Sequence, residues 1–115
     1  MLDFGIVKRQ VINAYFKLNK NSTLAWSLDD VMMFFKIFYA YHSKYAPYEH
    51  PHLKSESIEW IILNVSNDDT MEYNLDTYKA IIPQYFRTRF DDCDYSILHF
   101  MSGDIRLLRY YETCY

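Results

Sequence analysis

The sequence predicts an all-α protein: a compact single-domain bundle of five to six helices, with one apolar helix (about residues 28–45) at its centre. Three observations favour this fold. Half of the 115 residues are hydrophobic and 19% are aromatic, which is enough to fill one core. The two glycines and three prolines leave little material for hairpin turns. Apolar residues recur at helical spacing along most of the chain, so residues 1–115 are expected to form one helical domain.

The first helix is expected over residues 3–18. Its apolar side chains recur at helical spacing and share one face of the predicted helix. They are Phe4, Val7, Val11, Ala14, Tyr15 and Leu18. The polar run Asn19–Ser22 ends the pattern.

The central helix has the clearest signals in the chain. Ser27 is the predicted N-cap, and Asp29 and Asp30 place negative charge in the first turn. Apolar residues cover most of its circumference, so other elements are expected to pack against it on most sides. These residues are Val31, Met33, Phe34, Phe35, Ile37, Phe38, Ala40, Tyr41, His42 and Tyr45.

The connection after the central helix contains Pro47 and Pro51, which favour an extended conformation. A third helix is expected over residues 55–65, with Ile58 and Ile62 on its apolar face and Trp60 off that face.

A fourth helix is expected after Asn74 or Asp76, either of which can serve as its N-cap. Pro83 lies inside this helix and is expected to kink or split it.

The C-terminal part of the chain is expected to form two short helices, over residues 95–101 and 104–112. Asp92 or Asp94 is the predicted N-cap of the first. A hairpin that turns at Gly103 is the alternative for this segment.

Charge and cysteine content bound the function. The formal net charge of −3 argues against a protein that mainly coats duplex DNA, because such binding needs many cations against phosphates. The first ten residues mix charged and apolar residues, unlike a leader peptide. No apolar run approaches the ~20 residues that cross a bilayer, so no membrane partner is expected. Cys93 and Cys114 are expected to be free thiols, and the expected location is cytoplasmic.

The pair His50 and His52, beside Glu49, is the first candidate for a metal site. Zinc needs three or four converging ligands, and Pro51 opposes the helical spacing of a zinc-protease motif. We therefore expect these residues to form a structural crossover, with no bound metal and no other cofactor.

A catalytic role for Cys93 is not expected either. Asp91, Asp92 and Asp94 surround it in the sequence, and their negative charge opposes a thiolate. Helix capping is the favoured role of these aspartates over metal binding. A chain with two glycines also has no phosphate-binding glycine loop, so we expect that the protein is not an enzyme.

The C-terminal third concentrates the residue types that interfaces favour, tyrosine and arginine. We predict a partner-binding face there, formed by Tyr85, Arg87, Arg89, Arg106, Arg109 and Tyr110. The same arginines and aromatic residues could instead form a basic patch that binds single-stranded nucleic acid. Ion pairs with neighbouring acids are the favoured alternative use of the arginines.

Three runs in the chain carry a resemblance. They are E-H-P-H-L-K at Glu49–Lys54, Y-F-R-T-R-F-D-D-C-D-Y-S at Tyr85–Ser96, and H-F-M-S…R-Y-Y-E, which ends at Glu112. In these runs the chain resembles small helical proteins from replication or accessory modules of staphylococcal mobile genetic elements, namely cassettes, islands and phages. The resemblance implies a non-enzymatic accessory subunit that docks on a replication protein such as a polymerase, and it implies no catalytic residues.

The favoured function is therefore a cytoplasmic, non-catalytic subunit that binds another protein. The alternative is a phage-type inhibitor of a host or defence nucleic-acid enzyme, acting through an acidic surface. That surface would comprise Asp68, Asp69, Glu72 and Asp76. The third candidate is a single-stranded nucleic-acid binder that uses the basic-aromatic patch.

Overall fold

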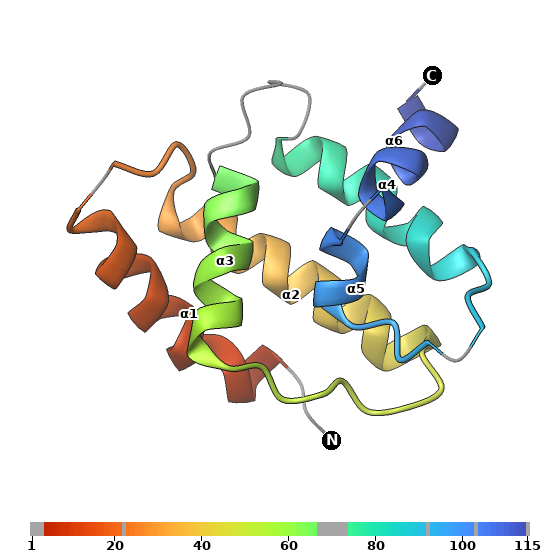
Figure 1. Cartoon of the computed structure of the whole chain (residues 1–115), viewed down its shortest axis with the longest axis horizontal. Coiled ribbons are helices and arrows are strands. Elements are labelled where there is room, and N and C mark those ends of the chain that lie inside the picture. Colours follow the sequence, from red (N-terminus) through yellow and green to blue (C-terminus); the bar gives the residue numbers. More distant parts are fainter. Residues whose placement is uncertain (1–3, 22, 67–73, 92, 103, 115) are drawn as a thin grey trace.

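The computed structural model of the chain is all-helical over the residues that it describes, which are 4–21, 23–66, 74–91, 93–102 and 104–114. In chain order the helices are α1 (Phe4–Asn19), α2 (Leu28–Tyr45), α3 (Ser55–Ser66), α4 (Leu75–Arg87), α5 (Ile97–Met101) and α6 (Ile105–Cys114) (Figure 1). The predicted all-α bundle is confirmed. No helix in these described ranges is long and apolar enough to cross a membrane.

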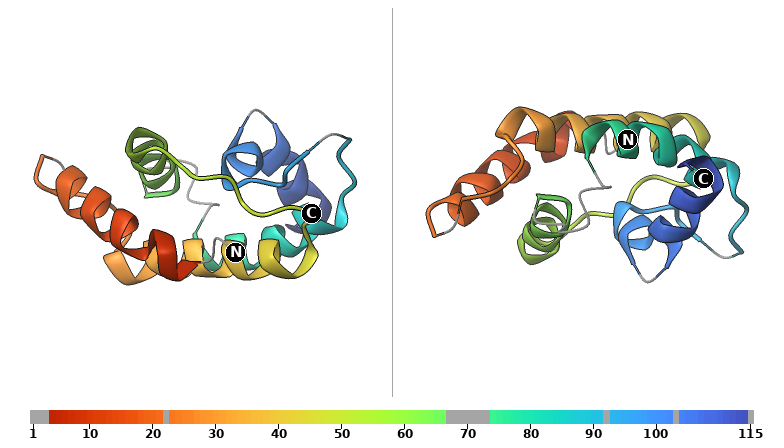
Figure 2. Two further views of the ribbon diagram at one scale, coloured as in Figure 1. Left: turned by 90° about the horizontal axis from the view of Figure 1, so that it is seen from below. Right: turned by 90° about the horizontal axis from the view of Figure 1, so that it is seen from above.

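The helices form two layers. Helices α1, α2 and α4 lie in one layer, with α2 in the middle, and α3, α5 and α6 cover it from one side (Figure 2). Contacts join α2 to α1, α3 and α4, and further contacts join α1 to α3 and α4 to α6. The core lies between the layers, as expected for helices that each bury one apolar face.

Helix α2 is the central helix that the sequence predicts. The Ser27 hydroxyl caps it by accepting a bond from the Asp30 N–H at 3.1 Å. Phe34, Phe35 and Phe38 are fully buried. Helix α2 is less covered than predicted, because Met33 is 40% exposed and Ala40 is exposed as well.

Helices α2 and α4 run in the same direction along one another. Their ring contacts advance together along both helices, from Phe34–Tyr78 at 4.9 Å to Tyr41–Phe86 at 6.2 Å between centroids. Pro83 does not split α4, contrary to one of the two expectations. Residues 79 and 80 are exposed, so water can reach the backbone near the carbonyl that Pro83 leaves unbonded.

Of the other predicted N-caps, Asn74 of α4 is confirmed and Asp94 of α5 is wrong. Asn74 caps α4 by accepting a bond from the Thr77 N–H at 2.9 Å. The N-cap of α5 is Ser96, not Asp94, while the predicted alternative Asp92 lies outside the described residues. Asp94 instead stabilises the turn that precedes α5, because its carboxylate accepts the Ser96 N–H at 3.1 Å. Helices α5 and α6 are separate, so the hairpin alternative is wrong.

Candidate functional site

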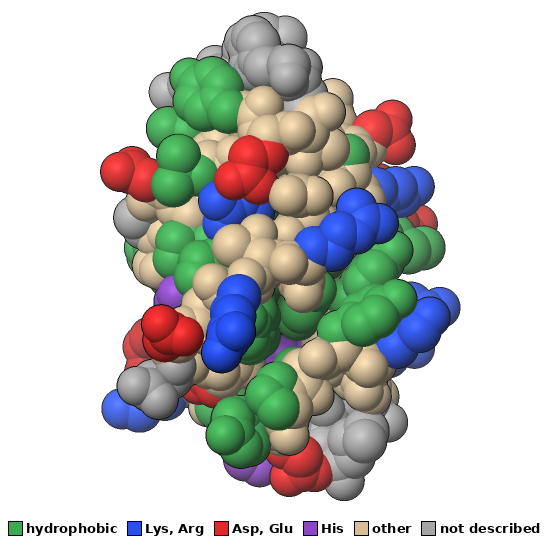
Figure 3. Space-filling model, turned by 90° about the vertical axis from the view of Figure 1, so that its right-hand side faces the viewer, with side chains coloured by type: hydrophobic (Ala, Val, Ile, Leu, Met, Phe, Trp, Pro, Cys, Tyr) green, Lys and Arg blue, Asp and Glu red, His purple; other side chains and the backbone are tan. Residues whose placement is uncertain are grey.

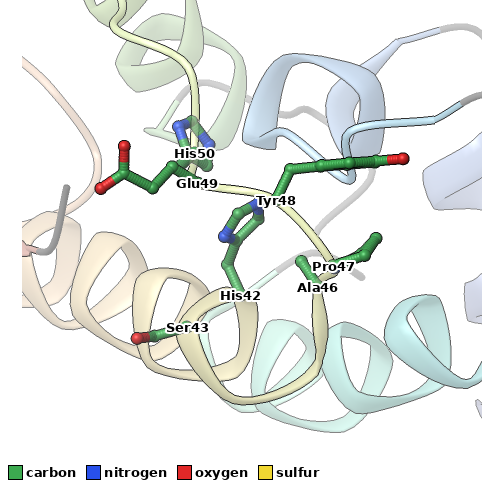
Figure 4. A pocket seen from close by; sticks show the side chains of 7 residues that line it. All are labelled: His42, Ser43, Ala46, Pro47, Tyr48, Glu49 and His50. Atoms are coloured by element: carbon green, nitrogen blue, oxygen red, sulfur yellow. The ribbon is translucent and has the colours of Figure 1, made fainter. Parts of the chain in front are cut away.

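A hollow of about 250 Å³ lies at the C-terminal end of α2, beside residues 46–50. Figure 4 shows the rings of His42 and His50 close together, with Glu49 and Tyr48 extending to opposite sides. The ring centroids are 4.8 Å apart, and both side chains are buried. A buried pair of titratable rings is a natural place to look for chemistry.

Both ring nitrogens of His50 are bonded within the chain. Nδ1–H donates to the Pro51 carbonyl at 2.8 Å, and Nε2 accepts the Ile97 N–H at 3.0 Å. These partners fix the neutral tautomer, and burial lowers the pKa of His50 to about 4. Because neither ring nitrogen has a free lone pair, His50 has no position for a metal ion. Its two hydrogen bonds instead connect the extended segment after α2 to the start of α5.

His42 makes a second hydrogen bond between α2 and the segment before α5. Its Nε2–H donates to the Asp94 carbonyl at 2.9 Å, and burial lowers its pKa. His52, the second histidine of the metal candidate predicted from the sequence, is exposed, whereas His50 is buried. Within the described parts of the chain, no three His, Cys, Asp or Glu side chains form a group that could hold a metal ion.

A second cluster joins Cys93, His99 and Tyr85. The Cys93 Sγ lies 3.4 Å from His99 Nδ1, and the Tyr85 hydroxyl lies 2.8 Å from the same nitrogen. Burial raises the pKa of Tyr85, so its hydroxyl stays protonated and can donate. The Tyr85 hydroxyl also lies 3.5 Å from the Ser96 carbonyl. Whichever of Tyr85 and His99 donates in the shorter bond, that bond engages His99 Nδ1, so Cys93 has no free base beside it.

The sequence does not predict this cluster. Cys93 lies in the segment before α5, and His99 lies six residues later on α5 itself. The chain reverses between them at Tyr95, which has a left-handed backbone with φ of 55°. The Tyr95 N–H donates to Cys93 Sγ at 3.2 Å. The cluster therefore holds a tight turn in place.

Two residues of the predicted partner-binding face, Tyr85 and Arg109, are buried in the structure. Tyr85 is fully buried between α2 and α5, and its ring lies 5.9 Å from that of Phe38. Arg109 is only 6% exposed, and its guanidinium makes two bonds to Glu112, at 2.6 and 3.1 Å. Neither side chain therefore adds exposed surface to the predicted partner-binding face.

The other four predicted residues differ in exposure. Arg106 is half-buried and donates to the Tyr78 hydroxyl at 2.7 Å, and Tyr110 packs at the edge of the core. Arg89 is exposed and lies 4.0 Å from Asp91, a distance at which an exposed ion pair is weak. Arg87 is exposed and lines an open groove. Arg87 and Arg89 are therefore the two predicted residues that a partner can reach, and Arg87 lies on the groove.

This groove runs between the C-terminal halves of α2 and α4. We call it the α2–α4 groove. It has a volume of about 140 Å³ and is lined by Tyr41, Tyr45, Pro83, Phe86 and Arg87. Tyr45 is 54% exposed, so an aromatic surface is open to solvent beside a cation. On this side of the molecule apolar side chains lie next to Lys and Arg (Figure 3).

The rings of the groove form a stacked series. Tyr45 and Tyr41 are 5.8 Å apart at 22°, Tyr41 and Phe86 are 6.2 Å apart at 15°, and Phe86 and Tyr95 are 6.0 Å apart at 21°. Such near-parallel, offset rings hold one another in place. The groove is therefore a firm surface, which reduces the entropy lost when a partner binds.

Comparison with known proteins gives no match to a family model, a curated protein or a solved structure. The resemblance to proteins of staphylococcal mobile elements therefore stays a prediction, and the function has to be argued from the surface of this chain.

Sequence reasoning placed Tyr41 and Tyr45 in the core of the central helix and so missed the groove. A usable signal is the change from phenylalanine to tyrosine along this stripe. Phe34 and Phe38 are buried, whereas Tyr41 and Tyr45, further along, are partly or largely exposed. Tyrosine combines an apolar ring with a polar tip, which suits the rim of a core.

Proposed function

We propose that the protein is a non-catalytic binding subunit that docks on another protein through the α2–α4 groove. One observation carries this proposal: an ordered aromatic surface lies open between α2 and α4, with Tyr45 54% exposed and Arg87 on its edge. Tyrosine and arginine dominate binding energy at interfaces because they bury area and donate hydrogen bonds at low entropic cost. The structural roles of the histidine pair and of Cys93 support a non-catalytic protein.

We propose a cytoplasmic replication protein, such as a polymerase, as the partner. The support is the resemblance to accessory proteins of staphylococcal mobile elements, on the runs Glu49–Lys54 and Tyr85–Ser96. Part of the second run faces the groove, since it contains Phe86 and Arg87. The acidic-inhibitor alternative depends on Asp68, Asp69, Glu72 and Asp76. The first three lie outside the described residues, and Asp76 is exposed in the first turn of α4.

The experiment compares the unaltered chain with four variants in affinity capture from the host, followed by affinity measurement with the purified captured protein. Tyr45→Ala and Arg87→Glu alter exposed groove residues. Trp60→Ala and Arg9→Glu are matched controls on α3 and α1, where both side chains are also exposed. We expect each groove variant to weaken binding by about tenfold or more, which is ≥ ~1.4 kcal/mol. Equal binding by the unaltered chain and both groove variants would place the partner elsewhere.

A second candidate, binding of single-stranded nucleic acid, is favoured by the stacked rings. Bases stack on aromatic side chains, and cations beside them attract phosphates. Such binding falls steeply with salt, in proportion to the number of phosphates neutralised. A titration of oligothymidylate at two salt concentrations tests this candidate, and the absence of binding at low salt would exclude it.

A further inference from the structure

The α2–α4 groove has a distinct charge. Lys44 and Arg87 lie in the last turns of α2 and α4, and the Lys44 Nζ sits 5.2 Å from the centre of the Tyr45 ring. Neither cation forms an ion pair with another residue in the described ranges. Both charges are therefore available at the edges of an apolar surface.

The acids of these two helices lie at their other ends. Residues 36–45 and 80–87 contain no Asp or Glu, whereas Asp29 and Asp30 begin α2 and Asp76 begins α4. At a rise of 1.5 Å per residue, Asp30 is about 21 Å from Lys44 along α2, and Asp76 is about 16 Å from Arg87 along α4. Both separations exceed the ~8 Å screening length at physiological salt. The two cations therefore have no acid of their own helix within that length. From other elements, Glu112 of α6 reaches Gln84 of α4 but is paired with Arg109, and Asp94 lies near the last turn of α2, where its carbonyl bonds His42.

The size of the groove favours a peptide over a nucleic acid or a small molecule. A volume of about 140 Å³ is well below the roughly 300–1,000 Å³ of small-molecule sites, and it suits one apolar side chain. Two rim cations on an acidic protein neutralise few phosphates, which gives a single strand little affinity. A peptide with carboxylates on either side of one apolar side chain matches both the small apolar groove and its two rim cations. An arginine can bond a carboxylate with two N–H groups.

We propose that the α2–α4 groove binds an acidic segment of the partner protein, with one aromatic or proline side chain seated against Tyr41 and Phe86 and carboxylates paired with Lys44 and Arg87. This inference rests on the proposed function and adds the chemistry of the partner to it. The helix dipoles favour cations at these helix ends, which also explains why Lys44 and Arg87 are tolerated there with no acid nearby on the same helix.

The test uses the full chain, immobilised, to select binders from a random peptide library. Peptides that also bind the Tyr45→Ala variant are removed, so the remainder depend on the groove. We expect the remainder to carry Asp or Glu on either side of an aromatic residue or proline. A selected peptide should lose affinity by about tenfold for Lys44→Glu with Arg87→Glu, because two rim ion pairs become repulsions. Lys8→Glu with Arg9→Glu, on exposed positions of α1, is the matched control and should change affinity by less than about twofold.

The outcomes separate this inference from the function on which it rests. Groove-dependent peptides that are neutral or basic would overturn the acidic chemistry and leave docking at the groove intact. Tighter binding of oligothymidylate than of any selected peptide, abolished by the same charge reversal, would overturn it in favour of nucleic acid. Recovery of no groove-dependent peptide would also overturn it, while the capture experiment with the natural partner decides the proposed function separately.

Discussion

At the scale of the residue, the neutral imidazole of His50 joins the middle of the chain to its last third. It donates to Pro51 and accepts from Ile97, and a protonated ring could no longer accept that second bond. His42 faces it at 4.8 Å between ring centroids, and the Asp94 charge nearby opposes the effect of burial only in part. The fold therefore prefers His50 uncharged.

Stability is expected to fall as the pH is lowered through the window between the two pKa values of His50. Its ordinary pKa of 6.5 applies to the unfolded chain, and its pKa in the fold is about 4, so below pH 6.5 the unfolded state binds the extra proton. This difference alone costs about 2 kcal/mol between pH 7 and pH 5. Urea unfolding across that range measures it. His50→Asn should flatten the slope, whereas His52→Asn, at an exposed position, should keep it.

A single hydroxyl also matters at Tyr95, where the backbone is left-handed. The Tyr95 hydroxyl donates to the Thr88 carbonyl and accepts the Phe90 N–H, each at 2.9 Å. Tyr95→Phe would leave both backbone groups without this partner, so we expect a loss of about 1–3 kcal/mol in unfolding free energy. Tyr48→Phe, at a side chain that is 68% exposed, is the control. Equal stability of both variants in urea would contradict these bonds.

At the scale of the element, α2 was predictable because its local signals agree with its place in the fold. Ser27 caps it, two acids follow in its first turn, and Phe34, Phe35 and Phe38 form the stripe that the core needs. The N-cap of α5 was less predictable. Asp94 and Ser96 are both good capping residues, and the backbone turn at Tyr95 decides between them.

The packing of α2 yields a prediction for Phe38, which contacts Tyr85, Phe86 and Phe100 across three ring pairs. Phe38→Ala should cost about 3–5 kcal/mol of unfolding free energy, because it removes a buried ring and leaves a cavity. Met33→Ala lies on the open side of the same helix and should cost much less. Thermal and urea unfolding of these two variants test whether α2 buries the side that carries Phe38.

At the scale of the whole molecule, the sequence was a better guide to the core than to the surface. Periodicity separates inward from outward positions on one helix, but it does not reveal which helix lies beside another. Tyr85 carries the composition of an interface, yet α2 and α5 bury it, and Arg109 is bonded by Glu112 of its own helix. The α2–α4 groove exists because two helices 30 residues apart run parallel, which no local pattern encodes.

The central claim is that a partner protein sits in this groove. The most direct measurement is photo-crosslinking in the host, with a photoreactive phenylalanine in place of Tyr45 on the groove or in place of Trp60 on α3. Both positions are exposed, so both probes can be accommodated. The account predicts one specific crosslinked protein from position 45, lost when Arg87→Glu is added, and none from position 60. Crosslinks to that protein from position 60 alone would contradict it.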